Sequence, residues 1–125
     1  MMTITATTAR LTIPNVGGTG ATFDAIETLC RQWATELGRH GVRVVWLRTT
    51  GIPEALQDTG ALVPDYGTES RMTAQEHVAW MQGQTMLKRL TSLVDVGNMA
   101  AFIASDQAAA MSASAANITC GAVPD

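Results

Sequence analysis

Glu76 and His77 stand side by side in the sequence, and Asp65 and Tyr66 precede them by about ten residues. A carboxylate, an imidazole and a phenol that meet in one cleft can bind or polarise a ligand. Together with the hydroxyl of Thr19, they are the residue types that could hydrolyse an activated ester or phosphoester without a cofactor. The simpler interpretation is that Glu76 belongs to a helix cap and that His77 and Asp65 are exposed.

The remaining metal-ligating residue types are widely spaced. Cys30 and Cys120 lie far apart and outside any Cys-x-x-Cys pattern, so we expect reduced, buried thiols, with a single disulfide as the alternative. His40 follows Arg39 and precedes a glycine, which is typical of a solvated turn. No short spacing joins His40 and His77 to the cysteines, so we expect no metal site.

Composition excludes some functions. Hydrophobic residues make up 46% of the 125 residues and charged residues 15%, with a formal net charge of −3. The lysines and arginines are scattered, so nucleic acid is not an expected partner, and no long apolar run predicts a membrane span. The first residues lack the features of an export signal, which favours a cytoplasmic location. Low charge for a single domain favours self-association.

The residue pattern predicts alternating strands and helices in one domain, 1–125. Apolar residues at helical spacing (Ile26, Leu29, Cys30, Trp33 and Leu37) end before two glycines and predict a helix. A nearly continuous apolar run at 42–47 is typical of a strand covered on both faces, and so of a parallel sheet. The other predicted elements are a strand at 3–8, helices at 73–90 and 92–105, one turn at 108–111 and a strand at 116–119.

Both later helices begin with a capping box, Thr73 with Glu76 and Ser92 with Asp95. The stretch 49–72, rich in glycine and proline, is expected to be a mobile, lid-like loop with one helical turn near Glu54. Right-handed crossovers would lay the strands parallel and in sequence order. We therefore expect an α/β protein with a truncated, Rossmann-like sheet of about three parallel strands flanked by helices.

Three segments carry a family resemblance. Glu36-Leu37-Gly38 followed by Gly41-Val42-Arg43-Val44 resembles the "E-L-G-x-x-G-I-R-V" of short-chain dehydrogenases/reductases. The stretch 87–106 is similar to their "R-x-x-x-P-E-D-V-A-x-x-x-x-F-L-A-S-D", and 116–121 stands where they end in "V-D-G-G". The resemblance covers nearly the whole chain. It implies the C-terminal half of the family fold, beginning at about the fifth of seven strands, without the half that binds NAD(P).

The resemblance also locates the catalytic positions. The family uses a Tyr-x-x-x-Lys pair, whose positions fall on Thr19 and Phe23, and a serine that would fall near Ala6 or Thr7. Neither threonine nor phenylalanine can replace the pair, because the tyrosine hydroxyl must exchange a proton. The glycines at 17, 18 and 20 lack the strand and helix that a dinucleotide turn needs. We therefore expect no cofactor and no hydride transfer.

These observations predict a cofactor-less member of the family that self-associates and acts as a binding or interaction module. The family packs the helix at 26–37 against its copy, and truncation would leave the edge of the strand at 3–8 unpaired. We therefore expect a homo-oligomer formed through this helix and this strand edge. The alternatives are a small cofactor-free hydrolase, with a possible small-molecule ligand, and a chain that docks onto a full-length relative.

Overall fold

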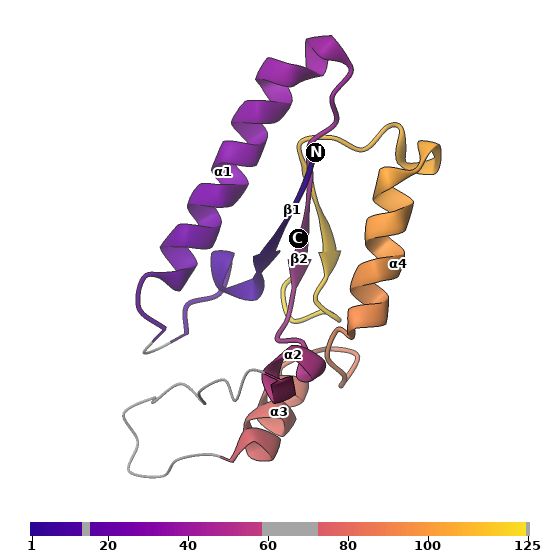
Figure 1. The fold of residues 1–125 in the computed structure, drawn as a ribbon. Helices are drawn as coiled ribbons and strands as arrows, with labels where there is room; N and C mark the ends of the chain where they lie inside the picture. Colours follow the sequence, from indigo (N-terminus) through magenta and orange to yellow (C-terminus); the bar gives the residue numbers. More distant parts are fainter. Residues whose placement is uncertain (14–15, 59–72, 125) are drawn as a thin grey trace.

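The computed structural model describes residues 1–13, 16–58 and 73–124. One sheet contains three strands in sequence order: β1 (Met2–Ala6), β2 (Val45–Thr49) and β3 (Ser114–Ile118). Both pairings are parallel, with Ile4 opposite Leu47 and Leu47 opposite Ala116. The three arrows point the same way in Figure 1. The predicted α/β, Rossmann-like class is therefore confirmed.

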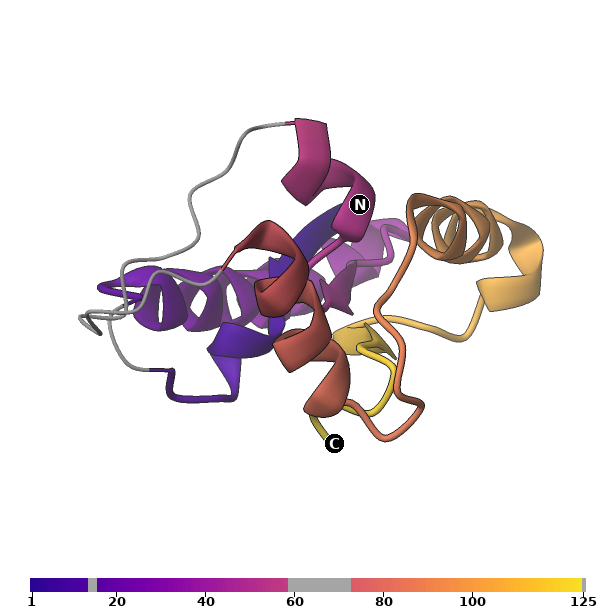
Figure 2. The ribbon, with the colours of Figure 1, turned by 90° about the horizontal axis from the view of Figure 1, so that it is seen from below.

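Two long helices cover the two faces of the sheet. The helix α1 (Thr19–Leu37) lies on one face and α4 (Leu93–Ala104) on the other, as Figure 2 shows. The shorter helices α2 (Pro53–Asp58) and α3 (Ala74–Gly83) lie beyond the carboxyl ends of the strands (Figure 1). The described residues also form three short 3-10 turns: η1 (Thr7–Ala9), η2 (Gly38–His40) and η3 (Asp106–Ala108).

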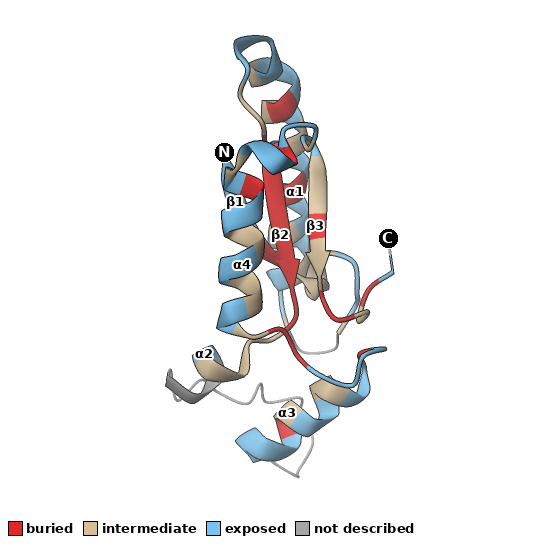
Figure 3. Cartoon of the chain, turned by 90° about the vertical axis from the view of Figure 1, so that its right-hand side faces the viewer, coloured by how far each residue is buried: buried red, intermediate tan, exposed pale blue. Residues whose placement is uncertain are grey.

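The strand β2 is the centre of the core. All five of its residues are buried, which Figure 3 shows as a continuous red strand. Because side chains alternate along a strand, its residues divide between the two layers. Val44 and Trp46 pack against α1, whereas Val45 and Leu47 pack against α4. The apolar run therefore does produce a strand covered on both faces, although the strand begins at Val45 rather than at residue 42.

The helix α1 begins earlier than its apolar spacing predicted. It starts at Thr19, so Gly20 lies in the first turn rather than in the preceding loop. A Cβ atom on Gly20 would lie only 2.8 Å from the carbonyl oxygen of Thr8, so only glycine allows η1 to approach the helix this closely. Its buried face also differs: Glu27, Cys30 and Ala34 are buried, whereas Leu29 is 43% exposed.

Both predicted capping boxes are present, at Thr73 with Glu76 and at Ser92 with Asp95. The helix α3 is shorter than predicted, because it ends at Gly83 and not near residue 90. The chain then turns through Lys88, whose φ of 53° cannot continue a right-handed helix. The helix α4 has nearly the predicted bounds, and its carbonyl end is held by Arg43, which donates to the carbonyls of Ile103, Ser105 and Ala108.

Several smaller predictions can be compared with the structure. The one turn predicted in the loop at 49–72 is α2, and the rest of that loop, 59–72, lies outside the described residues. Cys30 and Cys120 are free and buried, as expected. Within the described part of the chain, no helix has the length and apolar character needed to cross a membrane.

Candidate functional site

Three residues that bear on the predicted chemistry lie along one side of α1. Thr19, Phe23 and Glu27 are each four residues apart, so they occupy the same side of the helix. The Thr19 side chain is exposed and its Oγ1 donates to the carbonyl of Val16 at 2.6 Å. Phe23 is half-buried, and Glu27 is completely buried. Of these three positions, only the third, Glu27, therefore carries a charged side chain.

Glu27 is the centre of a buried ionic cluster that joins α1 to two strands. Arg48 donates from Nε to Glu27 Oε1 at 2.8 Å and from Nη2 to Oε2 at 2.7 Å, which makes a bidentate pair. The hydroxyl of Thr5 donates to Oε1 at 3.0 Å. Glu27, Arg48 and Thr5 are all 1% exposed or less. Arg10, which is partly exposed, adds a longer contact to Oε2 at 3.4 Å.

The cluster shifts the pKa of Glu27. Burial is the largest single influence and raises the pKa, because a carboxylate loses its water. The hydrogen bonds from Arg48 and Thr5, together with the charges of Arg48 and Arg10, outweigh that effect and leave the pKa below its usual value. Glu27 is therefore ionised at neutral pH, and its charge is neutralised by guanidinium groups rather than by solvent.

Sequence analysis did not find this cluster, although a signal was present. Glu27 precedes the buried Cys30 by three residues and the buried Ala34 by seven, so all three lie on the same side of the helix. Arg48 continues the alternation of Val44 and Trp46 in β2. A carboxylate and a guanidinium at two buried positions are the expected members of an ion pair. The apolar residues by themselves indicate a buried stripe that includes Leu29, whereas the buried residues are Glu27, Cys30 and Ala34.

The predicted hydrolytic residues do not form one described site. Glu76 is occupied by its capping box: its carboxylate accepts from the amide of Thr73 at 2.7 Å, and these hydrogen bonds lower its pKa. Thr19 lies at the start of α1, whereas Glu76 and His77 lie in the first turn of α3, a separate element (Figure 1). Asp65 and Tyr66 lie outside the described residues.

Among the candidates that the structure describes, His77 has an environment that differs from the expectation. It was expected to be exposed but is 7% exposed, because it packs against Trp80 with the two ring centres 5.9 Å apart. Burial lowers the pKa of the imidazole. His77 is therefore neutral at pH 7, so its ring is an acceptor as well as a donor.

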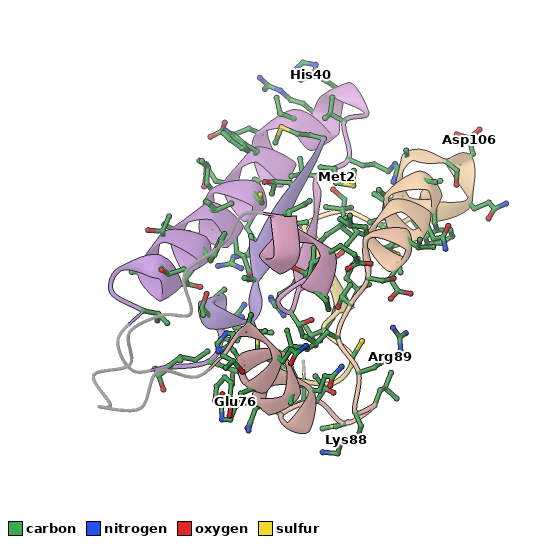
Figure 4. The ribbon with its side chains drawn as sticks, turned by 60° about the horizontal axis from the view of Figure 1, so that its bottom comes forward. Met2, His40, Glu76, Lys88, Arg89 and Asp106 are labelled. Carbon is green, nitrogen blue, oxygen red and sulfur yellow. The ribbon has the colours of Figure 1, made fainter. Side chains whose placement is uncertain are left out.

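His40 is exposed in η2, as expected, and lies at the opposite end of the molecule from Glu76 (Figure 4). This distance prevents His40 from sharing a metal ion with residues of α3. In residues 1–13, 16–58 and 73–124, no three histidine, cysteine, aspartate or glutamate side chains gather closely enough to hold a metal ion.

A groove of about 480 Å³ lies between α4 and the end of β3, and it contains none of the predicted site residues. Its wall is mostly apolar, with Met99, Phe102 and Ile118, and Arg89 lies at its rim. Arg89 binds Asp95 at 2.7 Å. The backbone amide of Ser92, together with Arg89 and the Ser92 hydroxyl, lowers the pKa of Asp95 to about 2. Because Arg89 is already paired, the groove offers apolar surface rather than a free charge.

The chain matches a family model described as enoyl-(acyl carrier protein) reductase over residues 1–122. The chain therefore belongs to this family, and the resemblance to short-chain dehydrogenases/reductases is confirmed. No curated protein matches the chain.

Solved structures of the family share the fold. Sorbitol-6-phosphate 2-dehydrogenase SrlD from Erwinia amylovora is 22% identical, with a TM-score of 0.78 over 99% of this chain and 48% of that one. FabI from Candidatus Liberibacter asiaticus is 19% identical, with a TM-score of 0.80 over 100% of this chain and 46% of that one. A short-chain type dehydrogenase/reductase from Mycobacterium ulcerans is 26% identical, with a TM-score of 0.73 over 97% and 40%. This chain spans about half the length of the structures it matches.

The residues before α1 do not fit a nicotinamide dinucleotide. In a dinucleotide fold, a strand runs through a tight glycine turn directly into a helix whose N-terminus faces the pyrophosphate. Here η1 and a further stretch of chain separate β1 from α1. Gly20 is used for close packing against the carbonyl of Thr8 rather than for approach to a phosphate.

Proposed function

We propose that this chain is a member of the short-chain dehydrogenase/reductase family that does not transfer hydride, and that it acts as a self-associating binding or interaction module. The observation that carries this proposal is the pair of residues at the family's catalytic positions. Thr19 and Phe23 occupy them, and the Thr19 hydroxyl already donates to the carbonyl of Val16.

Proton exchange with a carbonyl substrate needs an acid whose pKa lies near the working pH. A threonine hydroxyl titrates far above this range, and phenylalanine supplies no ammonium group to lower it. The next charge along this side of α1, the buried Glu27, is neutralised by Arg48 of β2. This stretch of α1 therefore supports packing rather than proton transfer.

Self-association is supported by the apolar surface of the chain. Leu29 on α1 is 43% exposed, and Ile4 on β1 is 50% exposed, in a protein with only 15% charged residues. The helix at 26–37 and the edge of β1 are the two surfaces through which we expect copies to meet. An unpaired strand edge with apolar neighbours favours pairing with another chain.

Two assays of the purified chain test this proposal. The first measures oxidation of NADH and NADPH with a panel of carbonyl and enoyl thioester substrates, and we expect no turnover. The second measures molar mass by light scattering at micromolar concentration, and we expect a multiple of the chain mass. Reproducible, protein-dependent cofactor oxidation contradicts the first part, and a monomer contradicts the second.

A cofactor-free hydrolase is the second candidate, and it is favoured by the lowered pKa of His77. A neutral imidazole is the form that accepts a proton in general-base catalysis. A panel of chromogenic esters and phosphoesters should show activity that is lost in His77→Gln and kept in His40→Gln, because His40 is exposed in a turn remote from α3. Equal rates in both variants, or no rate in either, contradict this candidate.

A further inference from the structure

The outer edge of β1 presents a regular set of backbone groups. The amide of Val45 donates to the carbonyl of Met1, which fixes the alternation along the strand. Met1, Thr3 and Thr5 therefore direct their backbone groups toward β2, and Met2, Ile4 and Ala6 direct theirs outward. β1 lies at one end of the described sheet, so these outward groups have no strand partner in it.

The three residues whose backbone groups point outward, Met2, Ile4 and Ala6, also carry the apolar side chains of the strand. Ile4 lies opposite Leu47 and Met2 opposite Val45, so both side chains are on the α4 face of the sheet. Ile4 is 50% exposed and Met2 is 42% exposed. Between Met2 and Ala6 there is no charged residue and no proline, the two devices that keep an edge strand from pairing.

We propose that two copies of the chain join through their β1 strands, which pair antiparallel across a twofold axis at Ile4. This inference rests on the self-association proposed above and specifies its geometry. In this register Ile4 lies opposite Ile4 of the other copy, and Met2 lies opposite Ala6. All three outward residues then pair, giving about six backbone hydrogen bonds. A register centred on Thr3 or Thr5 leaves one outward residue of each strand unpaired.

The sequence of the edge favours a second copy as the partner. The outward residues Met2, Ile4 and Ala6 are evenly spaced about Ile4 and all apolar, so in a reversed second copy each of them faces another apolar outward residue. Pairing places Ile4 against Ile4 on one face and brings no like charges together. The joined sheet has the three strands of each copy, and the twofold axis puts both α1 helices on one face and both α4 helices on the other.

Cysteine cross-linking tests the register. Residues in a hydrogen-bonded antiparallel pair have Cα atoms about 5.5 Å apart, a distance that a disulfide can bridge. Ile4→Cys should therefore form a covalent dimer under mild oxidation. Thr3→Cys is the matched control, because in this register it lies diagonal to its copy, at about 7–8 Å. The native Cys30 and Cys120 are buried, so the unsubstituted chain measures the background.

A second variant separates this inference from the proposed function. Ile4→Lys places two ammonium groups together at the axis and alters a half-exposed position, so the fold is kept and light scattering should show loss of the dimer. An assembly that persists in Ile4→Lys, with no Ile4→Cys cross-link, overturns the edge pairing while self-association stands. A cross-link at Thr3→Cys alone overturns the register. An unsubstituted chain that is monomeric overturns both proposals. This holds even if the edge of β1 then binds a strand of another protein.

Discussion

The first two turns of α1 and the turn that follows them differ in what the residues along one side of the helix do. Thr19 and Phe23, which the motif resemblance assigns to the family's catalytic positions, are a residue that bonds to the local backbone and an apolar residue. One turn later, Glu27 is completely buried and joins Arg48 and Thr5 in a cluster that connects the helix to two strands. The same helix face therefore combines a stretch without acid–base chemistry and a stretch with a dense ionic network.

If the proposed function is correct, the contacts that assemble this fold are separable from the residues that give the family its activity. The Glu27–Arg48 pair acts between the helix and the sheet, so it contributes wherever the chain must fold. Thr19 is exposed at the start of the helix, and Phe23 is only half-buried, so neither joins the helix to a strand through a buried charge. Substitutions in the two stretches should consequently have very different effects on stability.

The largest effect is expected for Arg48→Met. This change leaves the carboxylate of Glu27 buried without its main counter-charge, so the free energy of unfolding should fall by about 3–5 kcal/mol. Urea denaturation followed by circular dichroism measures the change. The double variant Glu27→Leu with Arg48→Met should recover most of the loss, because it removes both charges together.

A surface hydrogen bond provides the control for this prediction. Glu36→Gln removes the exposed carboxylate that accepts from Gln32, and its effect should stay within about 0.5 kcal/mol. An Arg48→Met variant that is as stable as Glu36→Gln would show that the ionic cluster does not hold α1 on the sheet.

The pH dependence of unfolding should follow Glu27. Its pKa is lower in the folded chain than in the unfolded chain, so its stabilising contribution is fully present above the unfolded pKa and is lost as the pH falls through the folded pKa. In Arg48→Met, burial dominates and raises the pKa of Glu27. Protonation of Glu27 at low pH should then remove the buried charge and raise the free energy of unfolding. Chemical denaturation at several pH values below 6 tests this, and equal slopes in the two proteins contradict it.

A smaller effect is expected at the start of α4. Ser92→Ala removes the hydroxyl that accepts from the amide of Asp95, and the loss of a helix cap costs about 1 kcal/mol. Thr73→Ala removes the equivalent cap of α3. Thermal unfolding of both variants measures these costs, and a Ser92→Ala loss as large as that of Arg48→Met would place the cap, and not the ion pair, at the centre of stability.

The smallest effect is expected at the catalytic position itself. Thr19→Val keeps the shape of the exposed side chain and removes its hydroxyl, so the free energy of unfolding should change by less than about 0.5 kcal/mol. No enzymatic rate should change, because we propose no proton transfer at this hydroxyl. A loss of several kcal/mol would show that the first turn of α1 is as important to the fold as the turn that contains Glu27.

The element order and fold class could be predicted because they depend on local signals. The capping boxes at Thr73 and Ser92 placed the starts of two helices, and the apolar run ending at Leu47 placed the central strand. The helix predicted to residue 90 was too long: α3 ends at Gly83, and the positive φ of Lys88, which the sequence does not announce, excludes a right-handed helix there. The Glu27–Arg48 pair joins residues 21 positions apart, so it becomes visible only when helix and strand are packed.

His77 was misjudged for a similar reason. Its neighbour Glu76 is exposed, and burial of His77 depends on the stacking of Trp80 one turn later. Glu76 lies on the helix predicted for it, whereas Thr19 lies in the first turn of a helix that was predicted to begin later, and sequence gave no measure of how these two elements are arranged. Asp65 and Tyr66 lie outside the described residues, so their part in a site stays a prediction.

Calorimetric titration of the purified chain with NADH and with NADPH tests the central claim most directly. We expect no saturable heat for either nucleotide, because η1 separates β1 from α1, Gly20 packs against the carbonyl of Thr8, and the side chains of Thr19 and Phe23 carry no charge for a cofactor. Saturable binding at one nucleotide per chain, abolished by Gly18→Val and unaffected by Gly38→Ala, would contradict it.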